Sequence, residues 1–190
     1  MLQKLGYDRE VPLQFNQKRV CGLWLTIIGT VIIVSTLFGG EYYLNPFIFM
    51  TGYFIGFYIS FLNSSVHRRL SQGPSASFQD RVGNIGVIAL FVLIFLIAGP
   101  FFPSLDWRMI WLGALLATGI HFFIFYYVHG KSMIILGMVC TVIAIVGMLL
   151  QPVPFLYFGI LDGATKLGVG LYLLFYSKPS VSVEHKSLGA

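Results

Sequence analysis

The sequence predicts an all-α polytopic membrane protein: a single bundle of six transmembrane helices with both termini in the cytoplasm. Of its 190 residues, 57% are hydrophobic and 10% are charged, whereas soluble domains contain roughly 25% charged residues. Six apolar runs have about the 17 to 25 residues that a membrane-spanning helix needs. They cover residues 20–39, 46–63, 82–102, 107–128, 132–150 and 154–176. The connections are short, so we expect one domain, with 1–19 and 177–190 as cytoplasmic tails.

Positive charge is distributed asymmetrically among the connections. Basic side chains precede the first span, lie between spans two and three and between four and five, and follow the sixth: Lys4, Arg9, Lys18, Arg19, Arg68, Arg69, Arg81, Lys131, Lys178 and Lys186. The opposite connections hold Glu41, Asp106 and Arg108. Basic residues favour the cytoplasmic side of a membrane. The net charge of +5 therefore indicates orientation in the cell membrane and a lipid bilayer as partner, and we expect no nucleic-acid binding.

The first two spans are predicted to serve helix packing. Residues 1–19 are expected to anchor at the membrane surface, and span 20–39 has no ionisable side chain inside its edges. Pro46 opens the second span, where proline suits the first helical turn. Small residues then recur every fourth position, at Gly52, Gly56, Ser60 and Ser64. Such a stripe lets another helix approach closely, either inside the bundle or in a homo-oligomer.

The middle of the chain alternates a loop with further spans. Residues 66–77 form the longest internal connection and are expected to be a flexible cytoplasmic loop. Span 82–102 is nearly pure hydrocarbon from Val87 to Ala98, so we expect it to face lipid. Asp106 is positioned to cap the helix that follows it. Gly130 allows a tight hairpin between spans 107–128 and 132–150.

The last span holds the main candidate site. Asp162 and Lys166 lie inside the apolar run 154–176, where each such charge costs roughly 2.5 to 3.5 kcal/mol and each Leu, Ile, Val or Phe returns only about 0.3 to 0.6 kcal/mol. The span is therefore marginal in lipid alone, and other helices must surround it. Counting about 1.5 Å per residue places Thr118, Thr141 and His121 near the same depth. We expect these five residues to form a polar column.

Each candidate residue has a structural and a functional interpretation. The acid precedes the base by four residues, which favours an ion pair along one helix face. That pair either orients the span or exchanges a proton or a partner during transport, and Lys166 alone could bind an anion. His121 either hydrogen-bonds a neighbouring helix or relays protons. Gly159 and Gly163 indicate either close helix packing or a helix break that lines a cavity.

No catalytic motif accompanies these residues. Asp162 is the only carboxylate well inside a span, so a two-metal centre would lack ligands, and we expect no enzyme, metal or cofactor. In size and span number the chain resembles the substrate-binding subunits of energy-coupling-factor vitamin transporters, although residues 23–31 lack the alanine spacing of their first helix. The sequence thus favours a carrier or channel for a small solute or ion, completed by a homodimer or a partner subunit. The alternative is a non-transporting accessory, immunity or sensor subunit with a structural ion pair.

Overall fold

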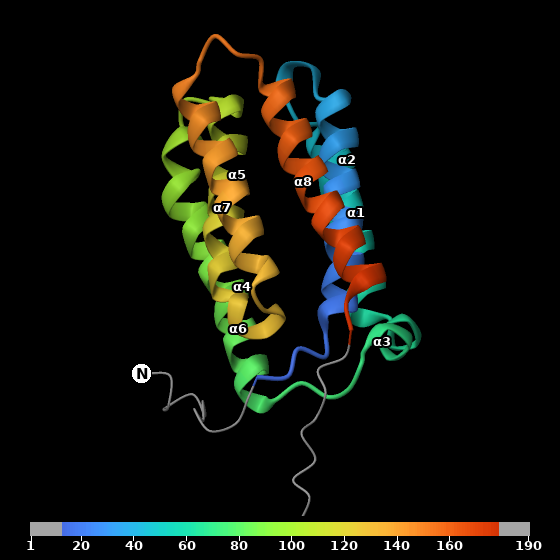
Figure 1. Ribbon diagram of the computed structural model, residues 1–190. Coiled ribbons are helices and arrows are strands. Elements are labelled where there is room, and N and C mark those ends of the chain that lie inside the picture. Colours follow the sequence, from blue (N-terminus) through green and yellow to red (C-terminus); the bar gives the residue numbers. More distant parts are fainter. Residues whose placement is uncertain (1–12, 179–190) are drawn as a thin grey trace, which may run out of the picture.

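The fold is a bundle of long, roughly aligned helices, seen in a computed structural model that describes residues 13–178 (Figure 1). The described residues contain no strand, which confirms the all-α prediction. The α-helices are α1 (Lys18–Leu37), α2 (Pro46–Phe57), α3 (Ser64–Leu70), α4 (Ser77–Ile97), α5 (Trp107–Ile124), α6 (Tyr126–His129), α7 (Ser132–Leu149) and α8 (Phe155–Tyr176). Short 3-10 turns lie at Gly40–Tyr42 and Gly99–Phe101, and a π-helical turn at Tyr58–Leu62.

Several of these helices are long and apolar enough to cross a membrane. Five pass by length and composition, namely α1, α4 with its following 3-10 turn, α5, α7 and α8. A sixth candidate is Pro46–Leu62 together with Ser64–Leu70, two pieces that are bent by 64° at their junction. The described residues therefore fit a membrane-embedded bundle.

The observed helix ends correct two predicted boundaries and agree with a third. The second span, predicted at 46–63, is the continuous helical segment Pro46–Leu62, whose last turn is π-helical, and Asn63 then caps α3 by accepting from the backbone N–H groups of Ser65 and Val66. Helix α4 begins at Ser77, five residues before the apolar run, where the Gln79 side chain accepts from the backbone N–H of Ala76. The span predicted at 107–128 is interrupted at Phe125, between α5 and α6.

The segment 66–77 is more ordered than the predicted flexible loop. Its first part belongs to α3, and the rest hydrogen-bonds to segments near both ends of the described chain. Asn16 Nδ2 donates to the Pro74 carbonyl at 3.0 Å, and Gln72 Nε2 donates to the Ser177 carbonyl at 3.2 Å. The loop at 71–76 therefore lies at the end of the bundle where α1 begins and α8 ends, below in Figure 1. We call this the basic end, because Lys18, Arg19, Lys131 and Lys178 flank its helices.

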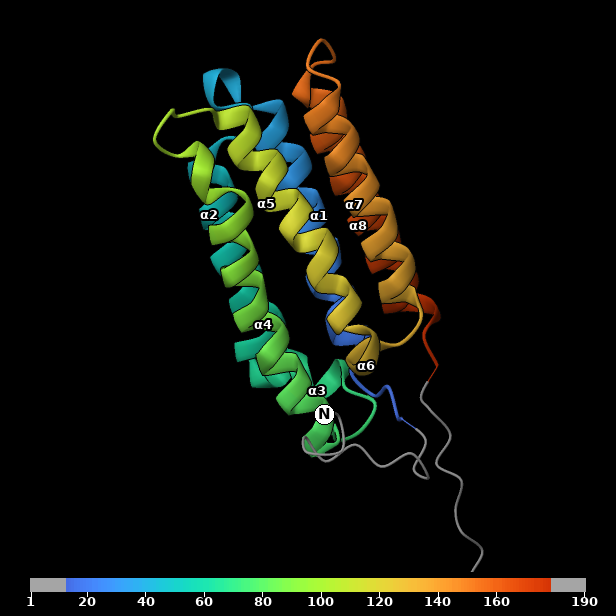
Figure 2. The same ribbon diagram turned by 90° about the vertical axis from the view of Figure 1, so that its left-hand side faces the viewer.

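The helices fall into two groups that α7 and α8 join. Helix α1 packs against α8 and α2, and α5 packs against α7 and α4, while α7 also contacts α8 (Figure 2). Glycine permits the closest approach: a Cβ atom on Gly29 of α1 would lie 2.6 Å from the carbonyl oxygen of Gly163 on α8. The backbones of α1 and α8 are thus in direct contact, as small residues allow in membrane bundles.

The predicted packing residues lie on inward faces. Cβ atoms on Gly52 and Gly56 would come within 2.5 Å and 2.6 Å of side-chain carbons of Val31 and Ile27 on α1. Ser60 is fully buried in the π-helical turn. A Cβ on Gly159 would lie 2.5 Å from Thr36 Oγ1 of α1. These positions face α1 within the chain.

The apolar core consists of two clusters. One is formed by Ile28, Ile32, Leu44, Trp111, Leu112, Leu115, Ala144, Phe155 and Phe158. The other, nearer the basic end, is formed by Cys21, Leu25, Phe122, Met133, Leu136, Cys140 and Leu173. Large apolar side chains also cover the outer surface, as lipid contact requires; Phe47, Phe95 and Leu149 are more than 70% exposed. Along α8 the two core clusters meet at the candidate site.

Candidate functional site

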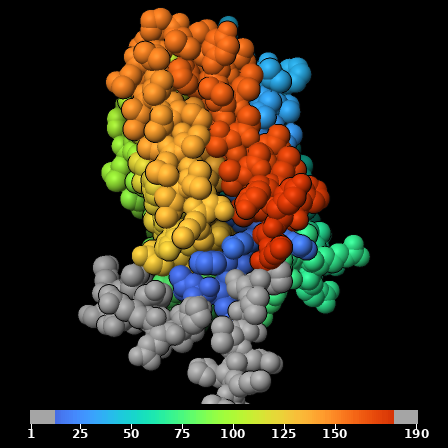
Figure 3. Space-filling view, viewed as in Figure 1, coloured from blue at the N-terminus to red at the C-terminus, as the bar shows by residue number. Residues whose placement is uncertain are grey.

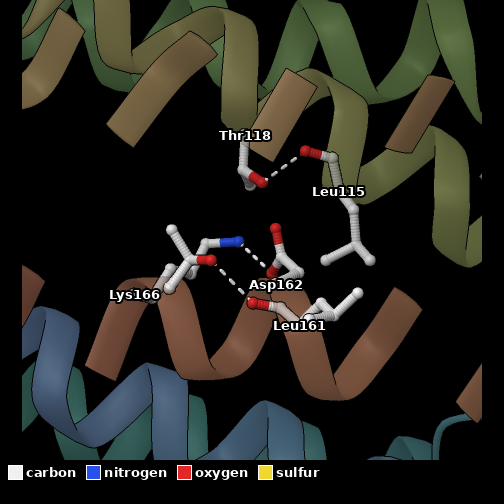
Figure 4. Close-up of polar contacts among 6 residues, drawn as sticks. Leu115, Thr118, Leu161, Asp162 and Lys166 are labelled. Carbon is white, nitrogen blue, oxygen red and sulfur yellow. Dashed lines mark hydrogen bonds and ion pairs between the residues drawn. The ribbon is translucent and has the colours of Figure 1, made fainter. Parts of the chain in front are cut away.

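Helix α8 carries the charged pair into the bundle interior. The helix is continuous from Phe155 to Tyr176, so the suggested break at Gly163 is wrong. Gly163 faces Gly29 and Ile33 of α1, and the neighbouring face presents Asp162 and Lys166 one turn apart. Because the glycine face lets α1 approach closely, α8 is held with both charges turned toward α5 and α7 (Figure 4).

Asp162 and Lys166 form a buried ion pair. Lys166 Nζ donates to Asp162 Oδ2, and the two side chains are 3% and 0% exposed. The Lys166 ammonium also lies 6.0 Å from the centroid of the Phe122 ring, within the range of a cation–π contact. The second carboxylate oxygen, Oδ1, is buried and receives no N–H or O–H donor from the described residues. The pair is therefore neutral as a unit but incompletely hydrogen-bonded.

Cys140 of α7 is a neighbour of the pair that the sequence did not single out. Its side chain is fully buried, and the thiol lies close enough to interact electrostatically with Lys166 and Asp162. Thr141, the adjacent residue, was predicted instead. A Cβ on Gly119 of α5 would lie 2.7 Å from Thr141 Oγ1, so that hydroxyl faces the α5 backbone. The rotation of α7 about its axis determines whether Cys140 or Thr141 faces the ion pair. The sequence prediction used only the depth of each residue along the helix, which does not specify this rotation.

Thr118 and His121 lie on α5, the helix that faces the pair in Figure 4. Thr118 Oγ1 donates to the carbonyl oxygen of Leu115 at 2.8 Å, on the helix that faces the ion pair in Figure 4. His121 is 8% exposed and lies near enough to Lys166 for an electrostatic interaction. Its ring stacks on Phe122, with centroids 5.1 Å apart. Of the five predicted residues, the structure thus gathers Asp162, Lys166, Thr118 and His121 around one interface.

Arg108, which the sequence analysis assigned to a connection between spans, is a second buried charged residue. Its Nη2 donates to the carbonyl oxygens of Gly147 and Leu150 at 2.9 Å and 3.1 Å. Its guanidinium lies 5.7 Å from the centroid of the Phe158 ring. A cation at the last carbonyls of a helix satisfies groups that have no partner within the helix. Arg108 therefore caps α7 from α5 at the end opposite the basic end.

Two further features of the described residues, possible metal ligands and surface grooves, do not add to this site. Within 13–178, no group of three or more His, Cys, Asp or Glu side chains is arranged to hold a metal ion. A shallow groove of about 190 Å³ lies on the outer surface where α7 and α8 run side by side (Figure 3). It is lined by Ser132, Ile135, Gly168, Val169 and Tyr172. The groove is mainly apolar and does not include the ion pair.

Comparison with known proteins identifies a family whose function is not known. The profile of a family described as "Family of unknown function (DUF6609)" matches residues 8–183. No curated protein and no solved structure matches the chain.

Proposed function

Because the chain belongs to this family of unknown function, we propose a role from the site itself: a carrier or channel of the cell membrane for a small solute or ion. In this proposal the Asp162–Lys166 pair changes its partners during transport. The observation that supports it is the buried Oδ1 of Asp162, which has no N–H or O–H donor among the described residues; the neighbouring Cys140 thiol is only a weak donor. Buried ion pairs stabilise proteins no better than apolar residues of the same size, and ionisable residues inside membranes mark ion and substrate pathways.

The chemistry of the pair suits such an exchange. A proton or cation that reaches Oδ1 would weaken the attraction between the carboxylate and the ammonium, and an anion would compete for Lys166 in the same way. Either event leaves a buried charge without its partner, which is costly in a low-dielectric interior. The bundle would then be driven toward another arrangement of α8 relative to α5 and α7, as alternating access requires.

The proposed orientation places the basic end in the cytoplasm. The hydrogen bonds of the 71–76 loop to Asn16 and to the carbonyl of Ser177 bring the loop and both described ends together. The segment from Pro46 to Leu70 would therefore cross the membrane as a broken span, giving six spans. Basic residues at this end agree with the positive-inside pattern.

Transport can be tested with purified protein in liposomes. The wild type should move at least one of H⁺, Na⁺, K⁺ or Cl⁻ faster than protein-free vesicles, as followed by ion-sensitive dyes. Asp162→Asn and Lys166→Met should each lower this flux to the protein-free rate. The double variant Asp162→Asn/Lys166→Met should remain monodisperse on size exclusion but inactive, because it keeps the fold and removes the exchangeable charges. Arg69→Met, which removes an exposed charge on α3, is the control and should keep the flux.

Two results would overturn the proposal. One is a wild type that leaves the permeability of the vesicles to all four ions unchanged. The other is a double variant that recovers the flux lost in the single variants, since the pair would then only hold the fold together.

A non-transporting subunit is the second candidate, and one observation favours it. The backbone contact between Gly29 and Gly163 fixes α8 against α1, as a structural pair on a rigid helix would need. In that case the ion pair would orient α8 for binding a partner subunit. Recovery by the double variant would favour this role.

A further inference from the structure

Two buried histidines remain without complete hydrogen bonding. His121 of α5 and His129 of α6 are 8% and 6% exposed. Nδ1 of each is buried and has no hydrogen-bond partner among the described residues. Buried imidazoles normally use their ring nitrogens as donor or acceptor, and an unpaired one needs an explanation. Nδ1 of His67, on α3, is likewise buried without a partner among the described residues. What distinguishes His121 and His129 is that both rings contact the same aromatic side chain, Phe125.

The ring of Phe125 separates the two imidazoles. Its centroid lies 4.6 Å from that of His121, edge to face, and 5.7 Å from that of His129, nearly parallel. Phe125 is also the residue at which α5 ends and α6 begins. A Cβ on Gly86 of α4 would lie 2.4 Å from Phe125 Cε2, so the ring fills the space that this glycine leaves. The three rings therefore form a continuous row of ring contacts, edge to face between His121 and Phe125 and stacked between Phe125 and His129.

This row of rings lies between the charged pair and the basic end. His121 interacts electrostatically with Lys166 of α8, and Cys140 of α7 lies beside the same ammonium. His129 interacts electrostatically with Lys18, at the start of α1. One histidine thus adjoins the proposed transport site and the other adjoins the basic end, where α1 begins.

We propose that protons reach the Asp162–Lys166 pair from the cytoplasmic end through His129 and then His121, with the ring of Phe125 as the gate between them. The proposal rests on the proposed function and specifies it, because it names the proton as the coupled or conducted ion. Imidazole suits this role, since one nitrogen can accept a proton while the other releases one. An aromatic ring between two such groups excludes the water through which a proton would pass.

Each proton transfer conserves atoms and charge. A proton from cytoplasmic water binds His129, and release from that ring returns it to the neutral form. Water admitted when the Phe125 ring turns aside carries the proton to His121. From His121 the proton passes through water to Oδ1 of Asp162, which becomes a neutral carboxylic acid and loses its attraction for the Lys166 ammonium. Release of the proton from Asp162 toward the opposite end restores the pair.

Proton uptake into proteoliposomes tests the pathway. A potassium gradient with valinomycin drives protons inward, and an enclosed pH-sensitive dye reports them. His121→Gln and His129→Gln should lose uptake to the level of Asp162→Asn, because an amide cannot relay protons. Phe125→Ala should raise uptake severalfold above wild type by opening the gate. Phe123→Ala, on the lipid-exposed side of α5, and His67→Gln, on α3, are matched controls and should behave as wild type.

The outcomes separate this inference from the proposed function. If the pair variants abolish proton uptake while His121→Gln and His129→Gln conduct as wild type, the pathway is wrong and the transport role stands. If the wild type moves Na⁺, K⁺ or Cl⁻ but no protons, the inference also fails alone. Failure of the wild type with all four ions removes both. Should Phe125→Ala or a glutamine variant not fold, Phe125→Leu and the asparagine variants replace them, and unchanged uptake in those variants counts equally against the pathway.

Discussion

At the scale of single residues, Asp162 and Lys166 each offset the free-energy cost of burying the other's charge in an apolar interior. Removing one partner of a buried ion pair leaves an uncompensated charge and costs about 3 to 5 kcal/mol. Asp162→Asn and Lys166→Met should therefore each lower stability by about that amount, and the double variant should recover most of it. Thermal denaturation in detergent, followed by circular dichroism, measures the difference. Single variants as stable as the wild type would show that the ion pair contributes little.

Arg108 stabilises the end of α7 by its side chain alone. Its two hydrogen bonds go to the carbonyls of Gly147 and Leu150, and hydrogen bonds to a charged donor contribute about 1.5 to 3 kcal/mol. Arg108→Met should lower stability by roughly 2 kcal/mol, because it keeps the apolar stem and leaves the carbonyls unpaired. Arg69→Met, at an exposed position, is the comparison in the same denaturation assay. Equal effects of the two changes would contradict the capping role.

His129 predicts a pH dependence of stability. Burial, and then the positive charge of Lys18, lower the pKa of His129 below its ordinary value, which is about 6.5. The unfolded chain therefore binds a proton at a pH where the folded chain does not. It follows that stability falls as the pH drops below about 6.5. The denaturation midpoint of the wild type should fall more between pH 7 and 5 than that of His129→Gln, and identical pH profiles would contradict it.

At the scale of helices, the contact between α1 and α8 depends on glycine at particular positions. A Cβ on Gly163 would lie 2.7 Å from Ile33 Cγ1 and 2.8 Å from the Gly29 carbonyl oxygen, whereas one on Gly168 meets nothing within 4 Å. Gly163→Ala should destabilise the protein by about 1 to 3 kcal/mol through overpacking. Gly168→Ala, on the same helix, should leave stability unchanged or raise it by about 0.5 to 1 kcal/mol. Equal denaturation midpoints would show that α1 and α8 are not in backbone contact.

Helix existence was predictable from the sequence, and several helix ends were not. The apolar runs located α7 and α8 to within one residue at each end, because lipid imposes a composition on every exposed span. Helix α4 extends below its apolar run through Gln79, whose side chain donates to the Tyr127 carbonyl. The interruption at Phe125 involves neither proline nor glycine, so no local signal marks it. Hydropathy locates the apolar depth of a helix, whereas tertiary hydrogen bonds determine where it starts and stops.

At the scale of the whole molecule, the sequence predicted how deep in the bundle the site residues lie, but not which side chains of neighbouring helices face one another. The spacing of Asp162 and Lys166 along one face is a property of α8 alone, and the structure pairs them. Whether Cys140 or Thr141 turns toward them depends on how α7 rotates against its neighbours. The approach of Arg108 to the end of α7 likewise depends on how two hairpins pack together. Contacts between helices are therefore the part of the site that one sequence leaves open.

The proposed orientation and number of spans concern the whole chain and can be tested by cysteine labelling. In the six-span arrangement the loop at 71–76 and the end of α8 share the cytoplasmic side, and the turn at 102–106 lies outside. Cys21 and Cys140 are buried and free, so the wild type should react little with a membrane-impermeant maleimide. Ser104→Cys should react in intact cells, whereas Ala76→Cys and Lys178→Cys should react only after permeabilisation.

These three exposed positions, together with the exposed Gln14 before α1, distinguish the alternatives; in the six-span arrangement Gln14→Cys reacts on the same side as Ala76→Cys and Lys178→Cys. If the bent segment from Pro46 to Leu70 entered and left on one side, five spans would remain. Four spans separate Ala76 from Lys178, so these two would still react together, and Gln14→Cys, before α1, would react from the opposite side. If all six spans crossed in the reverse direction, Ala76→Cys and Lys178→Cys would react together in intact cells and Ser104→Cys would not. In that case the basic end would face outward, and protons entering through His129 would come from outside the cell.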